Sequence, residues 1–272
     1  MIMSSKINSV YLQIANVVAI VGSIVFNALV NILPLNGITT GEVSNAYPNL
    51  FTPANYVFAI WGAIYTLLFV FMFYQIRTSQ RDSDYLQEIG FLYLLSAVVN
   101  IAWLTVFHYS YPAPNDLIIL TTVPIFGLFL TLLYIYLRLG VGVKDVSRGV
   151  RLAVQIPLSV YLGWLSVATI ANTASVLNYL GRSPGIPIEV QEMWTAAVII
   201  VAFLITFLML IRRKDFAFGL VVIWATLGIA SKQMASPLIY YTALGVAVVI
   251  FILIVILPLL KKESYAKYYI LS

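Results

Sequence analysis

The sequence predicts an all-α membrane protein, a polytopic helical bundle of about eight transmembrane helices. Hydrophobic residues make up 62% of the 272 residues and charged residues only 9%, whereas soluble domains carry about 25% charged residues. The apolar residues gather in long stretches, and the basic residues lie almost entirely on one side of them. With no cysteine, disulfides, thiolate metal sites and thiol nucleophiles are excluded.

The apolar stretches are compared in order with the ~20 residues that one helical span requires. They run 9–33, 53–76, 89–109, 116–137, 149–180, 190–211, 216–232 and 238–260. Only the seventh is short. The first exceeds the roughly 7–15-residue apolar region of a signal peptide, so we expect it to be a retained helix. The fifth is unusually long, and we expect Pro157 to kink it near its cytoplasmic end.

The basic residues predict the orientation. When the chain is threaded through the eight stretches, only Arg182 and Lys232 of its 15 Lys and Arg residues fall on the second side. Because positive charge accumulates in cytoplasmic loops, we expect both termini to be cytoplasmic in an integral, multi-pass protein, which would lie in the cell membrane of a prokaryote. The net charge of +5 then reflects anchoring. We expect contacts with membrane lipids and none with nucleic acid.

The positions of the charges restrict the function. All ten acidic residues lie in loops or at helix ends, and no Lys or Arg lies near a helix centre. Ion-coupled pumps place ionisable groups at the midplane, so a coupled transporter is disfavoured, while carriers of uncharged molecules stay open. We predict no catalytic residue and no metal site, which makes an enzyme the weaker alternative. The single histidine, His108, is expected at the membrane interface.

Polar and aromatic residues recur at helical spacing on three stretches and share one face on each. These residues are Trp61 and Tyr65, then Ser96, Asn100, Trp103 and Phe107, then Trp164, Ala168, Asn172 and Ser175. At 1.5 Å per residue the three faces reach a similar depth in the outer half of the bilayer. If the helices are neighbours, the faces line one aromatic cavity beneath the connection 34–52, a candidate lid.

Three segments resemble a known family. Residues 51–65 are similar to the loop and second helix of the TspO/MBR family, the tryptophan-rich sensory proteins related to the mitochondrial translocator protein. Residues 99–103 resemble its third helix, and residues 156–172 its fifth. The resemblance covers residues 9–180. It implies a TspO-like five-helix transmembrane core at 1–186, followed by a C-terminal three-helix transmembrane extension and cytoplasmic tail at 187–272.

The resemblance also implies a function. Family members bind porphyrins, haem or other flat hydrophobic molecules, often as homodimers, with roles in sensing, transport and tetrapyrrole handling. It therefore implies a receptor or sensor that needs no cofactor and takes a porphyrin or haem as its hydrophobic small-molecule ligand. Carried over by position, the ligand-binding residues are Trp61, Tyr65, Asn100, Trp103, Trp164, Ala168 and Asn172.

Other interpretations stay open. The protein is alternatively a carrier of, or an enzyme acting on, a tetrapyrrole or lipid-like molecule, or a structural assembly protein with a partner on its last three helices. The tryptophans alternatively fill space, and Asn100 and Asn172 alternatively link helices by hydrogen bonds of about 0.6–2 kcal/mol. The family's second tryptophan near the end of the fifth helix is absent, with Ser175 and Val176 there. Light-driven chemistry that needs it is therefore in doubt.

Overall fold

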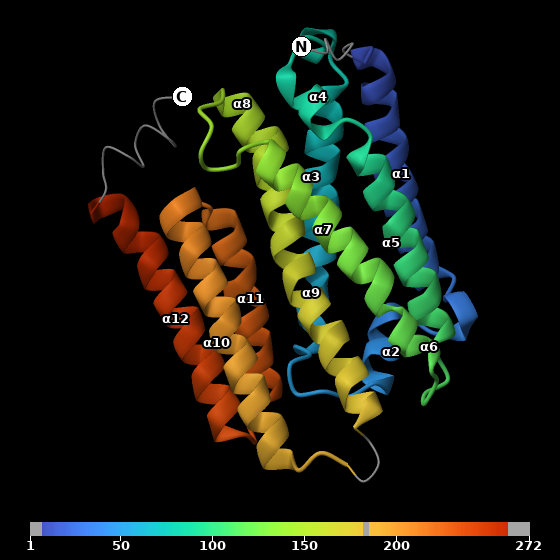
Figure 1. The fold of residues 1–272 in the computed structure, drawn as a ribbon, viewed down its shortest axis with the longest axis vertical. Coiled ribbons are helices and arrows are strands. Elements are labelled where there is room, and N and C mark those ends of the chain that lie inside the picture. Colours follow the sequence, from blue (N-terminus) through green and yellow to red (C-terminus); the bar gives the residue numbers. More distant parts are fainter. Residues whose placement is uncertain (1–6, 182–184, 261–272) are drawn as a thin grey trace, which may run out of the picture.

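The computed structural model describes residues 7–181 and 185–260, and every regular element in these ranges is helical. Two groups of long helices lie side by side (Figure 1). One group contains α1 (Ser9–Ile32), α3 (Ile60–Gln75), α5 (Leu92–Tyr109), α7 (Thr122–Arg138) and α9 (Ile156–Leu180). The other contains α10 (Ile188–Arg213), α11 (Phe216–Lys232) and α12 (Pro237–Leu260).

The predicted stretches are confirmed as helices. Within the described ranges, seven helical segments are long and apolar enough to cross a membrane, and α11, with 17 residues, is the short one that the sequence predicted. Large apolar side chains also cover the outer surface, among them Leu130 and Phe251, which are each 57% exposed. Such a surface suits hydrocarbon rather than water. The chain is therefore an integral, multi-pass membrane protein.

Shorter elements connect the long helices. They are η1 (Leu35–Gly37), α2 (Thr40–Ala46), η2 (Asn55–Ala59), η3 (Thr78–Gln80), α4 (Asp84–Ile89), α6 (Leu117–Leu120), α8 (Arg148–Val150) and the π-helical turn η4 (Arg151–Gln155). Residues 33–59, the first loop, contain three of them. There α2 begins with a capping box, in which Thr39 accepts from the Glu42 amide and the Glu42 side chain accepts from the Thr39 amide.

The irregularity expected at Pro157 takes the form of the π-helical turn that immediately precedes it. Proline has no N–H to donate, and its ring collides with the carbonyl four residues earlier, which here belongs to Ala153. A wider turn avoids that collision, and such π-bulges often accompany functional sites. The turn places Arg151 and Gln155 on the buried side of the bundle, 3% and 2% exposed.

Helix α11 joins the two groups. It packs against α9 as well as α10 and α12, and the approach to α9 is close, since a Cβ on Gly163 would lie 3.2 Å from Val221 Cβ. Midway along α11, Trp224 Nε1 donates to Val57 O in the first loop at 2.9 Å. At the N-terminal end of α11, Tyr136 of α7 donates to Asp215 at 2.8 Å. The predicted boundary at residue 186 thus separates the five-helix core from α10–α12. Two hydrogen bonds, at Trp224 and Asp215, link this second group to the core.

Candidate functional site

The predicted faces of α5 and α9 meet beneath the first loop. Trp103 on α5 and Trp164, Ala168 and Asn172 on α9 line a small cavity of about 50 Å³. Phe58, from the first loop, is also part of its wall. Four of the seven residues that were predicted for the ligand pocket are therefore brought together by the fold.

Two hydrogen-bond donors in this cavity's lining have no partner in the part of the chain that the structure describes. Asn172 Oδ1 accepts from Trp103 Nε1 at 3.3 Å and from Thr121 Oγ1 at 3.0 Å. Asn172 Nδ2 and Trp164 Nε1, in contrast, are buried without a hydrogen-bond partner among the described residues. An unsatisfied buried polar group costs about 1–3 kcal/mol. A ligand with acceptor atoms would remove that cost.

Trp61 and Tyr65 lie beside this cavity and do not line it. Their rings stack with centroids 5.6 Å apart, and Trp61 meets Trp164 edge to face at 6.3 Å and Tyr161 at 6.2 Å. Aromatic pairs of these kinds contribute about 0.5–1.5 kcal/mol each beyond area burial. The two side chains therefore support the Trp164 wall from the α3 side.

Asn100 serves as an interhelical link. Its Oδ1 accepts from Asn27 Nδ2 on α1 at 2.7 Å, and the same Asn27 group donates to Ser23 O at 2.8 Å. Asn100 does not line the cavity beneath the first loop. The Asn100 oxygen thus makes the interhelical hydrogen bond of the packing alternative, while Asn100 Nδ2 is buried without a partner among the described residues.

The first loop closes the cavity through polar contacts with α9 and with the end of α5. Asn49 Nδ2 donates to Ser175 Oγ at 2.8 Å, and Ser175 Oγ donates to Tyr47 O at 3.2 Å. Asn178 Nδ2 donates to Pro48 O at 2.6 Å. The Tyr47 hydroxyl reaches Ser110 O at 2.5 Å. Any ligand that enters from this side must break several of these hydrogen bonds.

His108 is buried beneath the same loop, in the last turn of α5. Its Nδ1 lies 2.8 Å from Leu104 O, and its Nε2 lies 3.3 Å from Thr40 Oγ1. Since a carbonyl oxygen only accepts, Nδ1 carries the proton, and in the neutral ring Nε2 accepts from the threonine hydroxyl. The sequence placed His108 correctly at a helix end, but it did not show that the loop folds back over that end.

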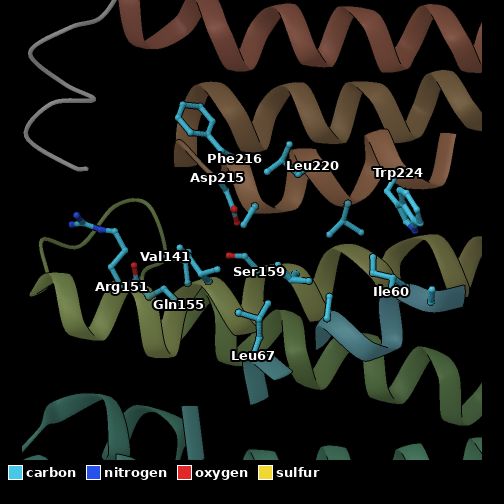
Figure 2. A pocket seen from close by; sticks show the side chains of 16 residues that line it. Ile60, Leu67, Val141, Arg151, Gln155, Ser159, Asp215, Phe216, Leu220 and Trp224 are labelled. Atoms are coloured by element: carbon cyan, nitrogen blue, oxygen red, sulfur yellow. The ribbon is translucent and has the colours of Figure 1, made fainter. Parts of the chain in front are cut away.

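A larger cavity lies elsewhere, in a groove between α3, α9 and α11 (Figure 2). The sequence did not predict this groove. Its volume is about 560 Å³, within the roughly 300–1,000 Å³ typical of ligand pockets. Arg151, Gln155, Ser159 and Asp215 contribute polar groups at one end. The sequence gave only a weak signal, because Asp215 and Arg151 were counted as loop and helix-end charges.

Asp215 caps α11 and is held by donors from three helices. Its Oδ1 accepts from the Phe218 amide at 3.0 Å and its Oδ2 from the Tyr136 hydroxyl at 2.8 Å. The Ser159 hydroxyl also hydrogen-bonds to the carboxylate, and the two side chains face each other (Figure 2). Burial nevertheless raises the pKa of Asp215, because desolvation outweighs the lowering effect of these hydrogen bonds.

Comparison with known families decides the assignment. The model of the family described as TSPO-like protein matches residues 13–256. The chain belongs to the TSPO-like protein family. The match continues beyond residue 186 and includes α10 and α11 and most of α12. Searches of curated proteins and of solved structures gave no significant match. Membership supports a general function as a membrane protein of the sensory, ligand-binding type.

Proposed function

We propose that this TSPO-like protein is a membrane receptor or sensor that binds a flat hydrophobic ligand, such as a porphyrin or haem, in the cavity beneath the first loop. The observation that carries the proposal is the combination of aromatic walls with two unsatisfied buried donors, Trp164 Nε1 and Asn172 Nδ2. Flat conjugated rings with polar atoms match both features.

Selectivity in this cavity comes from ring contacts and hydrogen bonds. A ligand that arrives from lipid gains little from apolar burial, since the hydrocarbon is already apolar. Each aromatic contact contributes about 0.5–1.5 kcal/mol, and each neutral hydrogen bond contributes about as much. Trp103 and Trp164 supply the rings, and Asn172 and Trp164 supply the donors.

Ligand entry requires the first loop to move. The cavity of about 50 Å³ is smaller than the roughly 300 Å³ at the low end for ligand pockets. The loop also contacts α11, because Gln233 Nε2 donates to Leu50 O at 3.1 Å and the Ala54 amide donates to Gly228 O at 3.1 Å. Opening of the loop would therefore be felt by the C-terminal helices, which is the coupling that a sensor needs.

Titration with protoporphyrin IX in a mild detergent, followed by tryptophan fluorescence, tests the proposal. Ala168→Leu should weaken binding about 5- to 150-fold, since added volume in a packed site costs about 1–3 kcal/mol. Ala102→Leu adds the same atoms at an exposed position of α5 and should bind like the wild type. Equal dissociation constants for the wild type and Ala168→Leu would refute the site.

A second pair of variants separates the two predicted amides. Asn172→Ala removes an amide that lines the cavity and should weaken binding by about 0.5–1.5 kcal/mol. Asn100→Ala removes one that pairs with Asn27 and should leave the affinity unchanged. The reverse result would place the ligand nearer to α1.

A further inference from the structure

The groove between α3, α9 and α11 opens sideways. Its floor is formed by η4 and α9, where Gln155 and Ser159 are 2% and 1% exposed. Its rims are exposed, with Ala63 on α3, and Leu220 and Trp224 on α11. Because these helices span the membrane, the open side faces hydrocarbon. The groove is therefore accessible to molecules that are dissolved in the bilayer.

The lining of the groove changes from apolar to polar along its length. Trp224 and Ile60 lie at one end, and Arg151, Gln155 and Asp215 lie toward the other (Figure 2). Phe216 and Trp224 are eight positions apart on α11, which corresponds to about 12 Å at 1.5 Å per residue. A long apolar slot that ends in polar groups matches a molecule with a hydrocarbon chain and a polar head.

The charge at the polar end favours an anionic head. Arg151 is 3% exposed and keeps its charge at any physiological pH. Its guanidinium donates to Val146 O at 3.4 Å among its contacts, and its side chain lines the groove. The Asp215 carboxylate is engaged by Tyr136, Ser159 and the Phe218 amide. These hydrogen-bond donors offset part of its negative charge at the polar end of the groove.

A second basic residue contacts the lining at this end. Arg213 donates to Val141 O at 3.2 Å, and Val141 belongs to the groove lining. Basic pockets between transmembrane helices bind anionic lipid head groups.

We propose that this groove is a binding site for an anionic phospholipid, with one acyl chain between α3 and α11 and the phosphate at the Arg151 end. The bound lipid would contact both helix groups at once, since α3 and α9 belong to the first and α11 to the second. It would therefore stabilise their association. The site is separate from the cavity beneath the first loop.

Native mass spectrometry of the delipidated full chain tests the proposal. It compares the binding of phosphatidylglycerol and phosphatidylcholine that carry the same acyl chains and differ only in the head group. The wild type should bind one phosphatidylglycerol about fivefold more tightly than phosphatidylcholine, because a basic residue near the head group contributes about 1 kcal/mol. Arg151→Gln should remove this preference. Arg81→Gln, an equal charge change at an exposed residue outside the groove, should retain it.

A second variant changes the apolar section of the groove, where the acyl chain would bind, and leaves the buried charges unchanged. Ala63→Phe fills the groove from its exposed rim and should weaken both lipids about tenfold. Ala102→Phe, on the exposed face of α5, should bind like the wild type. Equal affinity of the wild type for the two lipids would overturn the proposal. So would unchanged lipid binding by Ala63→Phe.

Discussion

Gly228 meets the first loop where no space remains for a side chain. Its carbonyl oxygen accepts from the Ala54 amide at 3.1 Å, and a Cβ at this position would lie 2.1 Å from Val57 Cγ2 and 3.1 Å from Pro53 Cβ. Val57 is fully buried, so it has no open space into which to rotate. Gly228→Ala should therefore push α11 away from the loop and weaken the joint between the two helix groups.

The expected size follows from two opposing effects. Overpacking costs about 1–3 kcal/mol, whereas alanine in place of glycine within a helix gains about 0.5–1 kcal/mol. Gly228→Ala should therefore lose up to about 2 kcal/mol of stability. Gly62→Ala on α3 is the matched control, because nothing lies within 4 Å of its added Cβ. Gly62→Ala should show only the stabilisation from alanine in a helix. The free energies of unfolding of the two variants should therefore differ by about 1–3 kcal/mol.

Thermal unfolding of both variants in one detergent measures this difference. A chain of this size shifts its melting temperature by about 2–4 °C per kcal/mol, so Gly228→Ala should melt several degrees below Gly62→Ala. Proteolysis of the first loop should be faster in Gly228→Ala than in the wild type as well. If Gly228→Ala is as stable as Gly62→Ala, the first loop moves aside for the added Cβ at no cost in stability. In that case α11 does not hold the loop in place.

Three further predictions concern orientation, autonomy of the core and pH. Because the chain has no cysteine, Thr39→Cys should react with an impermeant maleimide in intact cells and Ser147→Cys only after permeabilisation; the opposite labelling would reverse the topology. A chain that ends at residue 186 should insert and still bind protoporphyrin IX, since the cavity lining comes from residues 40–175; stable insertion without binding would implicate α10–α12. Burial raises the pKa of Asp215 above 3.8, so the folded state keeps this proton longer than the unfolded state. Stability should then fall as pH rises from about 4 through the raised pKa. Asp215→Asn should lack that slope in unfolding experiments, and an unchanged slope would show that other groups cause it.

The long helices were predictable because their length and apolar composition alone identify them. The seventh stretch was predicted to be short, and α11 has 17 residues. Helical spacing also grouped Trp164, Ala168 and Asn172 on one face of α9, and these residues line one cavity. Such local patterns survive folding because residues three and four apart remain neighbours on a helix.

Tertiary neighbours were not predictable in the same way. Asn100 shares a face with Trp103, yet its amide pairs with Asn27 of α1, and no pattern in the sequence indicates which helix supplies that partner. Asp215 lies in a short connection between two helices, a position that predicts a solvated side chain. Lys214 adopts a left-handed conformation with φ of 54°, and the chain reverses there so that Asp215 is 5% exposed. A single turn thus converts a loop charge into a buried one.

Helix α9 provides the physical route between the two proposed sites. It belongs to the segment 148–180, the most buried of the seven long apolar spans, and it lines both the cavity beneath the first loop and the α3–α9–α11 groove. Trp224 connects the same regions, since it lines the groove and donates to Val57 O in the loop. A ligand that opens the loop must strain this hydrogen bond. We therefore expect loop opening to change lipid binding in the groove, and lipid binding to change ligand affinity by the same factor.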